Sequence, residues 1–354
     1  MAEMKVGPMQ RVNILVIPAD SISRDTVIDV TTKAAKEFSF LTPQLHGPYS
    51  NVQLKYNPAT FSGDIDFGNS GFWMWEHRAP NASGNWAVDL KTGRGRHSFA
   101  IERQCITQAG AEALLEWYAS ELKLLFAQCV MLSSPEAEYA EARGYATAKT
   151  WRGRDCCLYH SPNVDDLAFG IPYLGWATVF GPAYCDFFGH ERLLSCPAPV
   201  VREIAPSHIL FQLTKDWNEI ETDCPIYNRV RESVIDHLGR QHFNRVRTAE
   251  DPPERTFNHQ RIVEVDESNV PPSLLPIRKE NERAYARFPQ STDQMPPPIQ
   301  TLDELLADEA RFEITNIGSS RVIIDKQRKE MISLADNALS DEWISRLSAV
   351  KQAK

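Results

Sequence analysis

Asp64 and Asp66 are the residues of this chain whose type and spacing are best suited to chemistry. On a β-strand, two residues that are two apart point to the same face, so both carboxylates could chelate one divalent cation. Further oxygen ligands would have to come from elsewhere in the fold. The spacing is also common in turns and on solvated strand faces. We expect a solvated face with no bound metal, and a metal-assisted hydrolase that uses this aspartate pair is the alternative.

Other enzyme classes lack their short motifs. His237 and His242 are five residues apart, whereas zinc-binding helices of the H-E-x-x-H type place two histidines four apart. Neither G-x-S-x-G nor the phosphate-binding G-x-x-x-x-G-K-[ST] occurs, and Gly93 and Gly95 have no third glycine of a G-x-G-x-x-G motif. A catalytic pair that assembles only in the fold stays open. The sequence therefore predicts no catalytic residue and no cofactor, and it favours a binding protein over an enzyme.

Phe72 to Trp75 is an unusually aromatic run. On a strand, Trp73 and Trp75 would share one face, with Phe72 and Met74 on the other. Apolar side chains on both faces are typical of a strand that is covered on both sides. An exposed tryptophan pair would instead be an anchor for a protein partner. Trp73 and Trp75 are therefore candidate partner-binding residues, together with Asp64 and Asp66.

The charge balance is acidic, with 38 basic and 47 acidic side chains and a formal net charge of -9. This balance repels a phosphate backbone, so we expect no nucleic-acid partner. An acidic surface would suit a basic protein partner, because complementary fields speed encounter and select the binding register. The simpler interpretation of the charge is solubility.

The compartment is predicted from what the sequence lacks. No export signal opens the chain, and no run approaches the roughly 18 apolar residues needed to cross a bilayer. The cysteines are odd in number and none are spaced C-x-x-C, which predicts ordinary buried thiols rather than disulfides. They are Cys105, Cys129, Cys156, Cys157, Cys185, Cys196 and Cys224. We expect a cytoplasmic protein without a membrane partner.

Hydrophobic periodicity predicts an α+β fold, in which a largely antiparallel sheet packs with long helices. Arg11 to Pro18 is a nearly unbroken apolar run typical of a buried strand, and Ser23 can cap a helix that follows it. A helix from Gln108 to Leu132 is expected on the strength of its broad apolar face. The other expected strands and helices are Val52 to Tyr56, Ile65 to Trp75, Trp86 to Leu90, His97 to Glu102, Val200 to Ala205, Ile209 to Leu213 and Ile226 to Leu238.

The composition changes after Arg247, where prolines become frequent. Proline interrupts regular backbone hydrogen bonding, so residues 248–300 are predicted to be a linker or an arm that wraps the main domain. Residues 1–247 are the predicted main domain. Residues 301–354 are a predicted C-terminal helical appendage, because Thr301 to Glu304 forms a capping box and Ser340 can cap a last helix.

The segment Gly170 to Gly181 is bounded by glycines and contains Trp176 and Thr178, and it is followed by PAYCDFFG and then ERLLS. It resembles the TsiV-like immunity domains of bacterial toxin systems, which are associated with type VI secretion or polymorphic toxins. The resemblance extends over about Gln108 to Phe243 and is distinctive only in its central dozen residues. The segment also has a structural interpretation, in which the glycines permit turns or close packing and Trp176 fills the core.

This resemblance implies a toxin-neutralising immunity protein whose partner is a cognate toxin. An immunity protein blocks its toxin by stoichiometric binding, so it needs no catalytic group of its own. Without an export signal, the toxin would act inside the cell, as a nuclease does, and an acidic surface could match a basic substrate channel. The proline-rich stretch and the tail depart from the family pattern, which leaves a diverged or fused function open.

Overall fold

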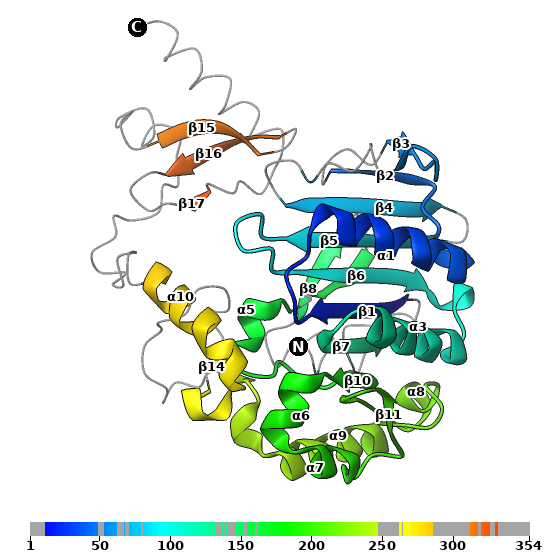
Figure 1. Cartoon of the computed structure of the whole chain (residues 1–354), viewed down its shortest axis with the longest axis vertical. Helices are drawn as coiled ribbons and strands as arrows, with labels where there is room; N and C mark the ends of the chain where they lie inside the picture. Colours follow the sequence, from blue (N-terminus) through cyan, green and yellow to red (C-terminus); the bar gives the residue numbers. More distant parts are fainter. Residues whose placement is uncertain are drawn as a thin grey trace, which may run out of the picture. The chain divides into compact units, whose positions relative to one another are not determined.

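A computed structural model describes residues 11–48, 53–61, 67, 71–78, 81–131, 136, 139, 146–151, 154–159, 162–246, 262–263, 265–285, 312–317, 320–325 and 330–331. The chain divides into two compact units, Met1–Arg283 and Ala284–Lys354. Figure 1 shows the elements of the chain.

A ten-stranded sheet lies at the centre of the first unit (Figure 1). In spatial order its strands are β11 (Val200–Ala205), β12 (His208–Gln212), β10 (Ala177–Phe180), β7 (Leu124–Met131), β1 (Arg11–Pro18), β6 (Gly95–Glu102), β5 (Asn81–Val88), β4 (Phe72–Arg78), β2 (Leu45–Pro48) and β3 (Leu54–Lys55). Every neighbouring pair runs antiparallel. The predicted α+β class and its largely antiparallel sheet are therefore confirmed.

Helices connect and cover these strands. They are α1 (Arg24–Glu37), α3 (Gln108–Glu121), α5 (Val164–Leu167), α6 (Pro182–Phe188), α7 (His190–Leu194), α8 (Glu219–Thr222), α9 (Cys224–Leu238) and α10 (Leu275–Tyr285). Single 3-10 turns occupy Ser39–Leu41, Arg103–Cys105, Arg240–His242, Glu267–Asn269 and Pro272–Leu274. Two small two-stranded antiparallel sheets pair β8 (Ala146–Trp151) with β9 (Arg154–Tyr159), and β13 (Arg245–Val246) with β14 (Ile262–Val263).

Local sequence accounts for several of these boundaries. Ser23 accepts a hydrogen bond from the backbone N–H of Thr26 and so caps α1, as its position predicted. The α1 side chains that are buried fall at three- and four-residue steps, which turns one stripe of the helix to the core. Gly239 ends α9 with a φ of 102°, which a glycine adopts without strain. The β11–β12 hairpin turns at Ser207, which has a positive φ.

The predicted helix from Gln108 to Leu132 is wrong in its second half. The helix α3 ends at Glu121, Leu122 adopts an extended backbone, and β7 begins at Leu124. All eight residues of β7 are buried, because β1 and β10 pair with its two edges and side chains cover both faces. A continuous apolar run fits a buried strand and a buried helix equally well, so periodicity could not separate the two.

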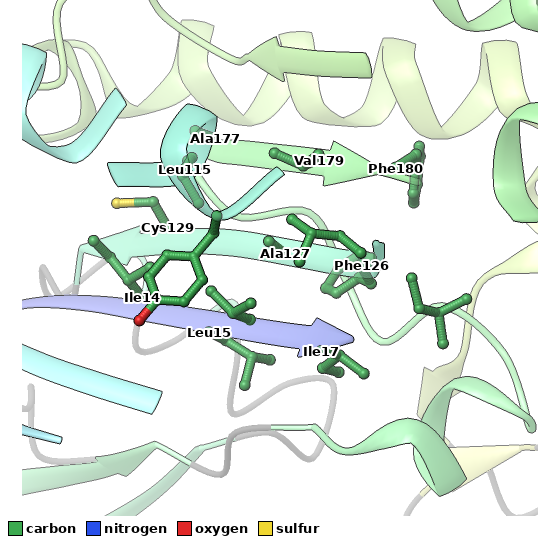
Figure 2. Packing of buried hydrophobic residues seen from close by; sticks show 14 of the residues in the cluster. Ile14, Leu15, Ile17, Leu115, Phe126, Ala127, Cys129, Ala177, Val179 and Phe180 are labelled. Carbon is green, nitrogen blue, oxygen red and sulfur yellow. The ribbon is translucent and has the colours of Figure 1, made fainter. Parts of the chain in front are cut away.

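The core is continuous across the three central strands. Figure 2 shows side chains of β1, β7 and β10 packed together, with Leu115 of α3 beside Cys129. On the face that carries Cys129, α3 lies over the sheet, and Tyr118 reaches His97 of β6. On the other face, Tyr184 of α6 packs on Phe180, with ring centroids 4.8 Å apart. The central strands therefore lie between helices on both sides.

His97 lies inside an aromatic cluster under α1 and α3. Its ring stacks on Trp86 with centroids 4.0 Å apart, and its Nδ1 is 2.8 Å from the hydroxyl of Tyr118. The Trp86 indole N–H donates to Thr31 of α1 at 3.2 Å. Burial lowers the pKa of His97 well below its ordinary value, because an imidazolium in this site would lose its hydration. The ring is therefore neutral at neutral pH.

A buried ion pair joins α9 to the segment after β7. The Arg231 side chain is fully buried, pairs with the carboxylate of Glu136, and lies 3.8 Å from the centre of the Tyr139 ring. Burial alone would lower the pKa of Arg231, but the nearby Glu136 carboxylate outweighs it and raises the pKa. Removal of either partner would leave a buried charge uncompensated, which typically costs about 3–5 kcal/mol.

The described part of the second unit is a three-stranded antiparallel sheet. Its strands are β15 (Phe312–Ile317), β16 (Ser320–Asp325) and β17 (Glu330–Met331). The helices predicted from Thr301 and Ser340 lie outside the described residues. No helix within the described residues is long and apolar enough to cross a membrane.

We predict that Gly181→Ala destabilises the protein by about 3 kcal/mol or more, because a Cβ there would overlap the carbonyl oxygen of Leu124. Gly110→Ala in α3 is the matched control, since its Cβ would lie 3.3 Å from the Thr107 hydroxyl and alanine favours a helix. Urea denaturation measures both free energies of unfolding. A Gly181→Ala variant as stable as Gly110→Ala would contradict the close approach of these two segments.

We also predict that stability falls as the pH drops below about 6.5, the ordinary pKa of histidine. The unfolded chain takes up a proton at His97 in this range and the folded chain does not, so the free energy of unfolding decreases by up to about 1.4 kcal/mol per pH unit for this residue. His97→Phe should flatten the dependence of unfolding free energy on pH between 7 and 5. An unchanged slope in that variant would contradict the assignment of a neutral buried imidazole.

Candidate functional site

The predicted partner-binding residues do not form a surface in the described structure. Trp73 and Trp75 are both buried, on the face of β4 that turns toward the aromatic cluster. Trp73 packs on Phe61 with centroids 5.5 Å apart, and Trp75 lies 6.1 Å from Phe99. Both indoles are therefore inside the protein, and neither faces solvent. Asp64 and Asp66 lie outside the described residues.

The four residues of the glycine-bounded segment lie in the core. Trp176 is fully buried, and its indole N–H donates to the Thr214 hydroxyl at 3.0 Å. Thr178 is fully buried in β10, and Gly181 is the N-cap residue that precedes α6. Gly170 has a φ of 131° and lies against Asn244, so a larger residue would be strained there. These residues hold the fold together and do not form a binding surface.

One serine and histidine pair comes together only in the folded chain. Ser195 Oγ lies 3.4 Å from Nε2 of His237. That same Nε2 is 2.8 Å from the backbone carbonyl oxygen of Arg192, which can only accept a hydrogen bond. Nε2 must therefore carry a proton, and it cannot also remove one from the serine. The pair lacks the base that nucleophilic catalysis requires.

The described buried thiols are held in their protonated form. Burial raises the pKa of Cys185 to about 11 and that of Cys196 to about 12. A thiolate is the reactive form of cysteine, so neither side chain is an activated nucleophile at neutral pH. Among the described residues, no cluster of three or more His, Cys, Asp or Glu side chains is arranged to hold a metal ion.

A cavity of about 230 Å³ lies where β5 and β6 meet α5, and both apolar and charged residues line it. Arg94 is its central charge and pairs with Glu280 of α10 at 2.6 Å and with Asp165 of α5 at 3.5 Å. Partial burial alone would raise the pKa of the lining residue Asp89, but hydrogen bonds from Lys91 and Thr92 and the charge of Arg94 lower it. A carboxyl with a lowered pKa is a poor proton donor at neutral pH, so this cavity has charged groups for recognition but Asp89 is no general acid.

The cavity also anchors part of the proline-rich segment. Asn281 of α10 donates to Asp165 at 3.0 Å, and Arg278 donates to the carbonyl oxygen of Val265 at 2.7 Å. Val265, Val270 and Leu274 are buried in the core of the first unit. Residues 265–283 therefore pack against the rest of the first unit.

A negatively charged surface gathers around α3, α8 and β11. Gln108 of α3 donates to Glu112 at 2.9 Å and to the backbone oxygen of Lys215 at 2.8 Å, so it joins α3 to the loop before α8. Arg202 of β11 pairs with Glu116 and lies 3.7 Å from Glu112. We define the acidic edge as the carboxylates of Glu112, Glu116, Asp216, Glu219, Glu221 and Asp223.

The acidic edge keeps an excess of negative charge. Within the part of the chain that the structure describes, Arg202 lies beside Glu112 and Glu116, and Arg103 lies close enough to Asp216 and Glu221 to be attracted by their charges. The Arg103 guanidinium lies 3.8 Å from the centre of the buried Trp217 ring and donates to Asn218. Asp216, Glu219 and Glu221 are exposed. The clustering of acidic residues from Asp216 to Asp223 can be seen in the sequence. That Glu112 and Glu116 of α3 lie beside them cannot, because the fold brings the two segments together.

Comparison with known proteins adds no assignment. No protein-family model matches the sequence, and no curated protein matches it.

We predict that Arg94→Met loosens the packing of residues 265–283, because the variant loses the ion pairs to Glu280 and Asp165. Amide hydrogen exchange over residues 265–283 should speed up about two- to fivefold, as expected for partly exposed pairs that are worth roughly 0.4–1 kcal/mol. Lys91→Met, which removes an exposed charge three residues away, is the control and should change nothing there. Equal exchange in both variants would show that apolar contacts alone hold the segment.

Proposed function

We propose that this chain is an immunity-type protein that neutralises a toxin in the cytoplasm by binding it stoichiometrically. The observation that carries the proposal is the acidic edge, whose carboxylates come from α3 and from residues 216–223, two segments that Gln108 joins. A toxin that acts on nucleic acid has a basic substrate channel, and such a channel complements this surface. The resemblance of residues 170–181 to TsiV-like immunity domains supports the same function.

The physical requirement for neutralisation by occlusion is a rigid acidic surface. A surface whose side chains are already positioned loses less entropy on binding than a mobile one. The Arg202 guanidinium pairs with the carboxylates of Glu112 and Glu116. The Gln108 amide donates hydrogen bonds to Glu112 and to the backbone oxygen of Lys215. These contacts fix the side chains on the α3 side of the acidic edge. The helix α3 beneath it is anchored by Leu114, Leu115 and Tyr118, which are fully buried. The carboxylates therefore stand on a fixed support.

The experiment co-expresses this chain with each protein encoded by the adjoining genes. A toxin among them should arrest growth alone and be tolerated when this chain is present in equal or greater amount. We predict that protection fails once the toxin exceeds this chain, because binding is one to one and not catalytic. Protection by substoichiometric amounts of the chain, or no associating toxin at all, would reject the proposal.

Charge reversal tests the acidic edge directly. We predict that Glu219→Lys with Glu221→Lys slows association with that toxin at least about tenfold at low salt, and that the difference shrinks as salt rises. Asp20→Lys with Glu37→Lys is the control, because both residues are exposed on the α1 side and the change in net charge is the same. Surface plasmon resonance measures the rates. An equal effect of both double variants would show that only the total charge matters.

The aspartate pair needs one further measurement. Titration calorimetry with magnesium, manganese and calcium should show no stoichiometric binding to the wild-type chain. A site that binds one ion and is lost in Asp64→Asn with Asp66→Asn would favour the metal-assisted hydrolase instead.

A further inference from the structure

Strand β11 is the last strand at one side of the ten-stranded sheet. It pairs with β12 on one edge, and among the described residues no hydrogen bond leaves the backbone of residues 200–205 toward another partner. The side chains of Val200, Val201 and Arg202 are half-exposed. An edge strand with free N–H and C=O groups is a template for another strand, and proteins usually block such an edge.

The ladder shows which residues of β11 face outward. The backbone N–H of Leu213 donates to the carbonyl oxygen of Trp176, so Leu213 points to β10. Backbone direction alternates along a strand, and Gln212 and Leu210 therefore point to β11, where they face Val200 and Arg202. Val201 and Glu203 must point their N–H and C=O groups away from the sheet. These two residues provide the open hydrogen-bonding positions.

The two faces of this edge differ in chemistry. Arg202 lies on the α3 side, where the carboxylates of Glu112 and Glu116 reach it. Val201 alternates to the opposite face, and its apolar side chain packs against the core there. A strand added beside β11 would therefore place every second side chain beside Arg202 and the carboxylates of Glu112 and Glu116, and the remaining ones beside Val201 and the exposed Glu203. Two carboxylates meet one guanidinium on the α3 side, so lysine or arginine fits there, and valine or isoleucine fits beside Val201.

We propose that β11 is a docking strand that binds an extended segment of a protein partner, in which basic and apolar residues alternate. The segment adds an eleventh strand through the backbone of Val201 and Glu203, and its basic side chains lie along Glu112 and Glu116 of the acidic edge. This inference rests on the function proposed above for the identity of the partner, because it names how a toxin would be held. The docking strand itself is tested without any toxin.

The test uses nine-residue peptides that alternate lysine with valine and carry a fluorescent label. Fluorescence anisotropy should show that the lysine peptide binds the full chain at least tenfold more tightly than a peptide with glutamate in place of lysine. The same lysine peptide with N-methyl groups on alternate residues keeps its charge but cannot pair as a strand, and its affinity should fall at least tenfold. Equal binding of the plain and methylated peptides would overturn the proposal, because charge alone would then explain the affinity.

Protein variants locate the site. Val201→Pro removes an outward N–H without breaking a bond to β12, so the sheet should persist while peptide affinity falls at least tenfold. Val201→Thr keeps the N–H and should bind within about threefold of wild type. Glu112→Gln with Glu116→Gln should weaken the lysine peptide several-fold. If Val201→Pro does not fold, the methylated peptide tests strand pairing on the wild-type protein. If Val201→Pro folds and binds the lysine peptide as tightly as wild type, the proposal is overturned.

The outcomes separate this inference from the proposed function. A toxin that binds wild type and Val201→Pro equally well would overturn the docking strand and leave the immunity function intact. Peptide binding at β11 in a chain that protects against no toxin would support the docking strand and reject the immunity function. Analytical ultracentrifugation supplies a further control. A wild-type dimer that Val201→Pro converts to a monomer would assign the edge to a second copy of this chain and overturn the proposed partner.

Discussion

The burial of β7 on both faces and both edges is the constraint on which the first unit depends. The strands β1 and β10 pair with its two edges, so β7 joins the two halves of the sheet. Its side chains need apolar cover above and below, which α3 provides on the Cys129 face and α6 on the face of Phe126. Close approach is required at Gly175, where a Cβ would lie 2.6 Å from the Cys129 carbonyl oxygen. Gly181, whose Cβ would overlap the Leu124 carbonyl oxygen, serves the same central packing.

Polar groups inside this core are placed with specific partners. The neutral ring of His97 is held by Tyr118 and Trp86, and Arg231 is neutralised by Glu136. An isolated charge in such surroundings would cost far more than one ordinary hydrogen bond contributes. These groups fix the positions of α3 and α9 relative to the sheet. Their chemistry is structural, and it directs attention to the edge of the sheet for function.

The edge at β11 gathers features that are separate in the sequence. The acidic run before α9, the two glutamates of α3 and the open strand come from three segments, and Gln108 and Arg202 hold them together. A surface of this kind combines long-range attraction with directional backbone hydrogen bonds. In the interaction proposed above, the charges would speed encounter and the strand edge would select an extended partner.

The sequence by itself determined the local elements. The apolar run of β1, the Ser23 cap of α1, the β11–β12 hairpin and the glycine stop of α9 are all set by residues within a few positions of each other, and the α+β class followed from them. Tertiary structure decided the rest. Only pairing with β1 and β10 made Leu124–Met131 a strand, because a continuous apolar run has no period of its own. Likewise, Trp73 and Trp75 are core residues because side chains of other segments, Phe61 and Phe99 among them, pack on them. The strand β11 is an open edge because no later strand pairs with it among the described residues. Such properties depend on contacts between distant segments, which local patterns do not encode.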